Sequence, residues 1–349
     1  MVLSAWARAA LFAESSADNV GAMAHERILV AGAGAIGSVI GAMLHRAGHR
    51  VTMLGRREHL EPARRDGLRI SGLLGEHVAR GIDAVEKAAG LDGRFDLILV
   101  TVKPYDTGQI ADAIASRLAP GGFVVSLQNG LGNIEALAAR FGIERVLGGR
   151  VIFGAEMPSP GTAHVTVFAD PIAIGPDPAQ QSETASLRHA ASEIAAILDG
   201  AGVPTVAVEN IMPVIWTKLL YNVALNPLGA LFAMSYGELT SDQDLRQVVD
   251  DVIEEAFGVA QQLGVELPFA DAAAYREVFY GRLIPATARH RPTMLKDLRG
   301  RGRTDIDALN GMIVDLGDML GVEVAANRML TRMIHGAERA RRAALGEEK

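Results

Sequence analysis

The chain of 349 residues contains no cysteine. Without thiol groups it can form neither disulfide bonds nor thiolate metal sites, and it has no cysteine nucleophile. The absence fits a reducing compartment, so we expect a cytoplasmic protein. The nine histidines show none of the spacings that are typical of metal sites, and we therefore expect no metal.

The sequence also lacks an excess of basic charge and any internal repeat. Its 34 lysines and arginines are outnumbered by 41 acidic residues, which gives a net charge of -7. This balance argues against nucleic acid as the main partner and favours a small-molecule ligand. The length, together with a hydrophobic content of 49%, allows two domains with substantial cores.

Residues 1–24 lack the pattern of a secretory signal, because Glu14 and Asp18 interrupt the apolar part. Met23 stands shortly before the first predicted strand. We expect this segment to be an extension, or translation to start at Met23. An intact mass that includes residues 1–22 would contradict the later start.

A glycine motif follows the first predicted strand. An apolar strand at 28–31 leads into the run Gly32, Ala33, Gly34, Ala35, Ile36 and Gly37, followed by a helical segment to residue 47 and a second strand at 51–54. In this strand–turn–helix context the first glycine permits the turn, the second lets a pyrophosphate approach, and the third lets the helix pack closely. The helix N-terminus then faces the phosphates. The motif predicts a dinucleotide-binding domain.

The residue that would contact the adenosine ribose is basic. Gly55, Arg56 and Arg57 follow the second strand, where NAD enzymes place an acidic residue. A guanidinium pairs with a 2′-phosphate, so Arg56 favours NADP(H). The alternative is that both arginines are solvated loop charges.

Two further predicted strands end in polar residues. Lys103 follows the strand at 97–102, and Asn129 follows the strand at 123–127. Ligands of open α/β sheets bind at the carboxyl ends of the strands, so both side chains are candidates for contact with the cofactor, and Asn129 also for the substrate. Lys103 is equally consistent with an exposed loop lysine, and Asn129-Gly130 with a simple turn.

The rest of the chain divides into a mixed first domain and a helical second domain. The first continues with a strand at 150–153, a hairpin at 164–168 and 172–174, a helix at 183–198 and a strand at 205–208. Helical periodicity then predicts a helix over 245–256, capped by Ser241, and another from about Thr304 to Leu320. We expect an NADP(H)-binding domain at 25–209, a helical substrate domain at 210–340 and a polar tail at 341–349.

One segment of the second domain carries unusual polar residues. If residues 211–227 are helical, Lys218, Asn222 and Asn226 share one face, because they lie four residues apart. Buried groups of this kind need partners or a function. A membrane span conflicts with the lysine, which costs about 2.5 to 3.5 kcal/mol at the centre of a bilayer. The alternative of a core helix with a lysine reaching solvent remains open.

Taken in order, these motifs resemble the ketopantoate reductase (2-dehydropantoate 2-reductase) family. The resemblance runs from about residue 26 to residue 335 and rests on these motifs: Gly32 to Gly37, Lys103, Gln128-Asn129-Gly130, Trp216-x-Lys218 with Asn222, Asn226 and Pro227, Thr293-Met294-Leu295-x-Asp297, and Thr304-Asp305-Ile306-Asp307-x-Leu309-Asn310-Gly311. It implies an α/β fold, with an N-terminal Rossmann-like domain and a C-terminal all-helical domain around a cleft. It also implies NADPH-dependent reduction of 2-dehydropantoate to (R)-pantoate on the way to pantothenate and coenzyme A.

The resemblance assigns roles to particular residues. Lys218 matches the catalytic lysine, which would stabilise the developing oxyanion and donate the proton. The positions that match contacts to the 2-oxo acid or the nicotinamide are Asn129, Asn222, Asn226 and Thr293. Asp305 matches an acid that binds the substrate hydroxyl, and Arg56 the position that meets the 2′-phosphate.

Two departures from the family pattern affect the substrate. The family commonly has glutamate at the position of Asp305 and serine at that of Thr293. The shorter side chain withdraws the carboxylate by about one bond length, which matters because misplacement by about 1 Å can cost ~100-fold in rate. Two alternatives are a related dehydrogenase that acts on another 2-oxo or 2-hydroxy acid and an NADP(H)-binding sensor without turnover. The sequence leaves open whether the chain acts alone or as a homodimer.

Overall fold

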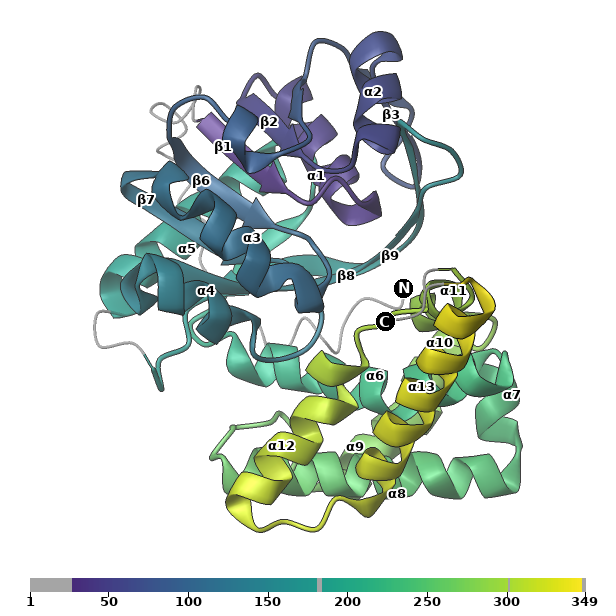
Figure 1. Ribbon diagram of the computed structural model, residues 1–349. Coiled ribbons are helices and arrows are strands. Elements are labelled where there is room, and N and C mark those ends of the chain that lie inside the picture. The colour runs from purple at the N-terminus through teal and green to yellow at the C-terminus, as the bar shows by residue number, and fades with distance from the viewer. Residues whose placement is uncertain (1–26, 181–183, 301, 347–349) are drawn as a thin grey trace. The chain divides into compact units, whose positions relative to one another are not determined.

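The computed structural model describes residues 27–180, 184–300 and 302–346. The predicted extension at 1–24 and the alternative start at Met23 lie outside this range. The chain forms two compact units (Figure 1). Unit 1 holds the described residues before Asn129 together with Asn133–Ile211, and unit 2 holds Asn129–Gly132 and the described residues from Met212 onward. An α/β unit and a helical unit confirm the predicted fold class.

Unit 1 is built on one mixed sheet of ten strands in the described part of the chain. The strand order is β4-β3-β9-β8-β7-β6-β1-β2-β5, and β10 pairs with β9. The pairs β8/β9 and β3/β4 are antiparallel, whereas all other pairs are parallel. The strands are β1 (Arg27–Ala31), β2 (Arg50–Leu54), β3 (Leu68–Gly72), β4 (His77–Ala79), β5 (Asp83–Val85), β6 (Phe95–Val100), β7 (Leu118–Ser126), β8 (Val146–Glu156), β9 (Thr162–Gly175) and β10 (Thr205–Ala207).

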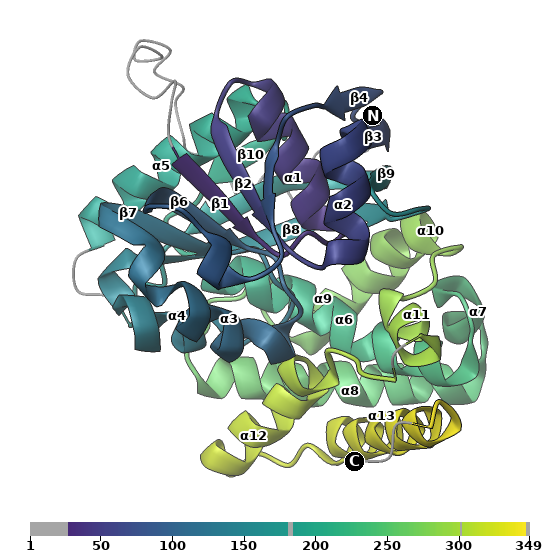
Figure 2. The ribbon, with the colours of Figure 1, turned by 45° about the horizontal axis from the view of Figure 1, so that its top comes forward.

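Helices cover both faces of this sheet (Figure 2). They are α1 (Ala35–Arg46), α2 (Arg57–Asp66), α3 (Thr107–Ile114), α4 (Asn133–Phe141) and α5 (Thr184–Gly200). Side chains alternate along each strand, so Ile28 and Val30 of β1 join the core with α1 and α5, while Leu29 is buried outside that core. Burial on both faces explains why the central strands are continuous apolar runs.

Two details of unit 1 differ from the sequence-based expectation. The segments at 164–168 and 172–174 are not the two arms of a hairpin, because both belong to the single strand β9. The true hairpin joins β8 to β9, and its register shifts near Asp170. Helix α2, which begins directly after Arg56, was not predicted.

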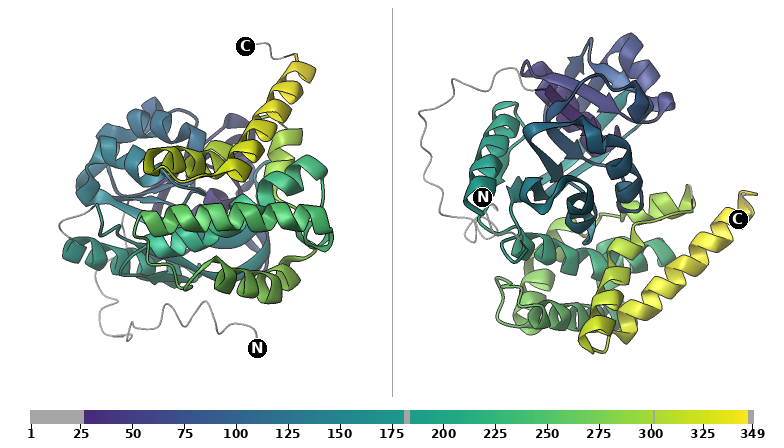
Figure 3. Two further views of the ribbon diagram at one scale, coloured as in Figure 1. Left: turned by 90° about the horizontal axis from the view of Figure 1, so that it is seen from below. Right: turned by 60° about the vertical axis from the view of Figure 1, so that its left-hand side comes forward.

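The regular secondary structure of unit 2 is entirely helical in its described residues. Its helices are α6 (Met212–Phe232), α7 (Tyr236–Ser241), α8 (Gln243–Gln262), α9 (Ala272–Val278), a π-helical turn (Phe279–Leu283), α10 (Ile284–Thr287), α11 (Thr293–Arg299), a 3₁₀ turn (Ile306–Ala308), α12 (Asn310–Leu320) and α13 (Ala325–Ala344). Helix α6 packs against α7, α8, α11 and α13. This central position explains its apolar character on nearly every side. The last helix, α13, is yellow in Figure 3.

Some helix ends in unit 2 were also misplaced. Helix α8 is capped by Asp242, whose Oδ1 accepts from Asp244 N and Leu245 N, and not by Ser241. The helix expected from Thr304 is a short 3₁₀ turn followed by α12. Among the residues that the structure describes, no helix is both long and apolar enough to cross a bilayer.

Candidate functional site

The glycine-rich turn of unit 1 joins β1 to α1. Gly32 has φ of +127°, and a Cβ atom there would lie 2.6 Å from Val102 N. A Cβ on Gly37 would lie 2.0 Å from Gly32 O, so the start of α1 can approach the turn only without a side chain. By contrast, a Cβ on Gly34 would meet none of the described atoms within 4 Å. Open space therefore lies beside Gly34, which is the N-cap residue of α1.

This geometry fits a dinucleotide. No side chain of the described residues caps the start of α1, so the N–H groups of its first residues are available to an anion. Ala33 lies in the turn, and Ala35 and Ile36 are the first two residues of α1. The N–H groups of Gly32 and Ala33 both donate to Leu54 O. The turn is thereby anchored to the carboxyl end of β2.

Arg56 lies beside this turn. A Cβ on the preceding Gly55 would lie 2.4 Å from Ala33 Cβ, so the two loops are in close contact. The Arg56 side chain is 55% exposed and lies 3.2 Å from Glu58 Oε1. Arg57 instead belongs to α2 and donates to Glu61 over 3.0 Å, a hydrogen bond that raises the pKa of Arg57. Of the two arginines, Arg56 is thus the one that directly follows the contact between the two loops.

Lys103 is partly buried in the loop after β6. Gln128 fixes this loop, because its Nε2 donates to Val102 O over 3.0 Å and to Thr107 Oγ1 over 2.7 Å. Gln128 belongs to the motif Gln128-Asn129-Gly130, but no role was predicted for it. Its amide joins the ends of β6 and β7 within unit 1.

In unit 2, Lys218, Asn222 and Asn226 lie on α6, as their spacing predicted. Lys218 is partly buried, and its Nζ donates to Asn129 Oδ1 over 2.6 Å. Asn222 and Asn226 are only 8% and 9% exposed. The helix thus brings a cation and two buried amides to one face, next to a third amide from the loop after β7.

The segment that carries Asp305 contacts the loop that carries Asn129. Leu131 N donates to Ala308 O over 3.0 Å. Gly130 has φ of +81° and lies close to the same oxygen, because a Cβ on Gly130 would be 2.2 Å from it. Asp305 is 5% exposed and precedes the 3₁₀ turn that ends at Ala308. Contact between the loop and this turn therefore ties Asn129 to the segment that carries Asp305.

Buried Glu338 of α13 holds the start of the Asp305 segment. Its Oε1 accepts from Thr304 N over 2.7 Å and from Thr304 Oγ1 over 2.8 Å. Thr304 Oγ1 in turn accepts from Ile306 N over 3.2 Å. These hydrogen bonds fix the backbone on both sides of Asp305.

A proline in α6 anchors the other end of this segment. Pro227 has no N–H group, so the carbonyl of Val223 lacks its normal helical partner. Asn310 Nδ2 donates to that carbonyl over 3.0 Å and to Asn327 Oδ1 over the same distance. Asn310 is completely buried. The first residue of α12 is thus attached to the middle of α6, between Asn222 and Asn226.

Thr293 is less closely tied to the others. It is the exposed first residue of α11 and follows Pro292, against which Gly229 of α6 packs. This packing places Thr293 near the Asn226 end of α6. Among the described residues, Thr293 makes no hydrogen bond to the other candidate residues.

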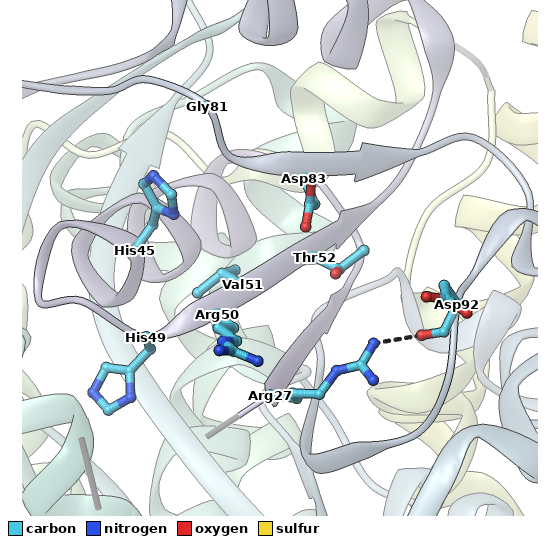
Figure 4. A pocket seen from close by; sticks show the side chains of 9 residues that line it. All are labelled: Arg27, His45, His49, Arg50, Val51, Thr52, Gly81, Asp83 and Asp92. Carbon is cyan, nitrogen blue, oxygen red and sulfur yellow. Dashed lines mark hydrogen bonds between the residues drawn. The ribbon is translucent and has the colours of Figure 1, made fainter. Parts of the chain in front are cut away.

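A separate pocket of about 450 Å³ lies in unit 1 (Figure 4). Arg27, Arg50 and Asp83, which line it, are the first residues of β1, β2 and β5. Arg27 Nη2 donates to Asp92 O over 2.6 Å. The pocket therefore lies at the amino ends of these parallel strands, whereas Gly32 and Arg56 follow their carboxyl ends. It is not part of the candidate site.

Comparisons with known proteins agree with this arrangement. The family model described as "Ketopantoate reductase PanE/ApbA" matches residues 28–179, and the model of the C-terminal part of the same family matches residues 210–338. The chain belongs to the ketopantoate reductase family. The resemblance inferred from the motifs is thus confirmed.

Relatives of this family match over nearly their whole length. The 2-dehydropantoate 2-reductase of Aquifex aeolicus is 35% identical over 314 residues, which cover 89% of this chain and 97% of the relative. The enzyme of the same name from Archaeoglobus fulgidus is 34% identical, with coverage of 90% and 98%.

Solved structures also match this chain over nearly their whole length. The PanE/ApbA family ketopantoate reductase of Ralstonia eutropha has a TM-score of 0.79 at 33% identity, with coverage of 90% of this chain and 99% of that one. A D-mandelate dehydrogenase in complex with NADH and anilino(oxo)acetate also has a TM-score of 0.79, at 25% identity and the same coverage. This chain therefore belongs to a family of nicotinamide-dinucleotide-dependent oxidoreductases.

Proposed function

We propose that the protein catalyses the NADPH-dependent reduction of 2-dehydropantoate to (R)-pantoate, a step toward pantothenate and coenzyme A. The observation that carries the proposal is the 2.6 Å hydrogen bond from Lys218 Nζ to Asn129 Oδ1, on the same helix face as the two buried amides of Asn222 and Asn226. A binding protein without turnover has no need of a proton donor held in this way. We assign cofactor binding to residues 25–209 and substrate binding to residues 210–340, in the cytoplasm.

The residues of unit 1 bind and orient the cofactor in this proposal. Gly32 to Gly37 and the start of α1 hold the pyrophosphate, and Arg56 pairs with the 2′-phosphate. We also assign cofactor contacts to Lys103 of unit 1 and to Asn129, which belongs to unit 2. The bound cofactor supplies a hydride for the C2 ketone of the substrate.

Lys218 supplies the charge and the proton. As the ketone carbon accepts the hydride, negative charge grows on the ketone oxygen, and the ammonium group of Lys218 stabilises it. Nζ then transfers a proton to that oxygen, which gives the C2 hydroxyl, and Lys218 recovers its proton from solvent. Asn129 holds Nζ in place before this step.

The remaining polar residues bind the 2-oxo acid. Asn222, Asn226 and Thr293 offer hydrogen bonds to its carboxylate and ketone oxygens. The carboxylate of Asp305 accepts a hydrogen bond from the hydroxyl group of 2-dehydropantoate. An acid fixed by its neighbours on both sides can distinguish a substrate with a hydroxyl from one without it.

A second candidate function is reduction of a different 2-oxo acid. It is favoured by the structural similarity to a D-mandelate dehydrogenase solved with NADH and anilino(oxo)acetate and by aspartate, in place of the commoner glutamate, at position 305.

One assay distinguishes these functions. Oxidation of NADPH and NADH is followed at 340 nm with 2-dehydropantoate and with aliphatic and aromatic 2-oxo acids. The proposal requires the highest kcat/KM for NADPH with 2-dehydropantoate. A higher value with an aromatic 2-oxo acid would establish the second function, and absence of turnover with every acid would leave only a binding role.

A further inference from the structure

Asn226 has a hydrogen-bond partner, Tyr236, that was not among the predicted site residues. Tyr236, the first residue of α7, is 3% exposed, and its hydroxyl donates to Asn226 Oδ1 over 2.8 Å. An asparagine side chain has one acceptor oxygen and one NH₂ donor. Because Tyr236 occupies the oxygen, Nδ2 is turned to the opposite side of the amide.

The ring of Tyr236 is itself held firmly. Its backbone N–H donates to His290 O over 3.0 Å, and its ring lies 5.1 Å from that of His290 and 5.6 Å from that of Tyr221. Burial raises the pKa of the Tyr236 hydroxyl well above its usual value, and the nearby Tyr221 and Asp305 raise it further. The hydroxyl therefore keeps its proton and remains a donor at every working pH.

We infer that Tyr236 is a positioning residue of the 2-oxo acid site: its hydroxyl fixes the amide of Asn226 so that Nδ2 donates to an oxygen of the substrate. The inference rests on the proposed function, because it assigns the bound oxygen to a 2-oxo acid. Without the hydroxyl, the amide could turn by 180° and present Oδ1, which repels a carboxylate or ketone oxygen.

The chain offers a matched control for this inference. Tyr221 belongs to the same aromatic cluster, and its hydroxyl is hydrogen-bonded to Thr287 Oγ1 over 2.6 Å. Both Tyr236→Phe and Tyr221→Phe remove one inner hydroxyl and keep the ring. Only the first removes a hydrogen bond to a candidate substrate-binding residue.

The kinetic test is a double-mutant cycle with the full-length enzyme and NADPH. We expect Tyr236→Phe to lower kcat/KM for the 2-oxo acid about tenfold, mostly through a higher KM, as is typical of the loss of one hydrogen bond that orders a ligand contact. The KM for NADPH and the values for Tyr221→Phe should stay within about twofold of wild type. In an Asn226→Ala background, Tyr236→Phe should change kcat/KM by less than about twofold, since the amide that it orients is gone.

A measurement without turnover covers the case in which no 2-oxo acid is reduced. The side-chain NH₂ resonances of Asn226 are assigned in ¹⁵N-labelled protein by their loss in Asn226→Ala. We expect Tyr236→Phe to shift them and Tyr221→Phe to leave them in place. Unchanged resonances in Tyr236→Phe, or an equal loss of kcat/KM in both asparagine and alanine backgrounds, would overturn the inference. An inactive wild-type enzyme with shifted resonances would refute the proposed function and the substrate role of the amide, but not its orientation by Tyr236.

Discussion

Lys218 Nζ and Asn129 Oδ1 lie 2.6 Å apart, although 89 residues separate them in the chain. The amide oxygen accepts a hydrogen bond from the ammonium group, fixes its direction and carries no net charge of its own. The arrangement therefore suits a lysine that must stabilise a growing oxyanion.

From this relationship we expect Lys218→Ala to lower kcat for the 2-oxo acid at least ~100-fold, which is the lower end of the contribution of a general acid. The dissociation constant for NADPH, measured by fluorescence titration, should change less than about threefold, because Lys218 lies in unit 2 and the predicted phosphate contacts lie in unit 1. Lys296→Ala is the control, since Lys296 is an exposed lysine of the same unit. Wild-type turnover in Lys218→Ala would remove Lys218 from the mechanism.

Arg56 should determine the choice of cofactor. Its exposed side chain follows Gly55, which packs against Ala33 of the glycine-rich turn. Loss of a charge-assisted hydrogen bond to a phosphate corresponds to about 10- to 100-fold in affinity. We expect Arg56→Ala to reduce the ratio of kcat/KM for NADPH over NADH by this factor, with NADH kinetics unchanged. Arg57→Ala, which removes a guanidinium paired with Glu61, should leave the ratio unaltered. A ratio that falls only in Arg57→Ala would reverse the assignment.

Gly34 and Gly37 should respond differently to alanine. The methyl group of Gly34→Ala would enter open space, so the variant should fold with a loss of at most about 1 kcal/mol from the poorer N-cap. Its affinity for NADPH should nevertheless fall about tenfold or more, because the methyl group occupies the approach of the pyrophosphate. In Gly37→Ala the methyl group would lie 2.0 Å from Gly32 O, so we expect a lower Tm even without cofactor. Thermal unfolding with and without NADPH separates the two effects, and unimpaired NADPH binding by Gly34→Ala would contradict the phosphate site.

His59 should make the stability of unit 1 depend on pH. Its Nδ1 accepts from Gly161 N over 3.0 Å and its Nε2 lies 2.9 Å from Ser38 Oγ, so the folded ring is neutral. Burial and then the charge of Arg56 lower the pKa of His59. In the unfolded chain the pKa of His59 is about 6.5. As the pH falls below this value, the unfolded chain binds a proton at His59 but the folded chain does not, so the free energy of unfolding decreases.

We therefore expect the free energy of unfolding to fall between pH 7.5 and pH 5.5 in the wild type and to fall less in His59→Gln. Urea unfolding at the two pH values measures the difference. His189→Gln is the control, because that side chain is 77% exposed. An equal decrease in His59→Gln and the wild type would place the pH dependence elsewhere.

Local patterns predicted the parts of the fold that depend on near neighbours in sequence. The glycine turn and the face of α6 follow from spacings of a few residues, and both were found. A hairpin was predicted in place of the single strand β9, because Asp170-Pro171 is typical of a turn. In the structure, Arg150 Nη2 donates to Asp170 Oδ2 over 2.7 Å and to Pro171 O over 3.1 Å, and a register shift absorbs the irregularity.

The supporting residues of the site escaped prediction for a related reason. Asn310 contacts Val223 across 87 residues and Glu338 contacts Thr304 across 34. A single sequence contains no signal for which distant residue an amide or a carboxylate will meet. The contact of Tyr236 with Asn226 was not predicted either, because Tyr236 ends an apolar run and its position is typical of a core residue.

Pro227 leaves the carbonyl of Val223 without a helical partner, and Asn310 donates a hydrogen bond to it. Substitutions at positions 227 and 310 should therefore affect each other. An N–H at position 227 would give Val223 O a helical donor that competes with the Asn310 amide for this oxygen. Replacing Asn310 by an apolar residue would leave the carbonyl unsatisfied. Each change alters one side of the same hydrogen bond, so the effects of the two substitutions on the free energy of unfolding should not be additive.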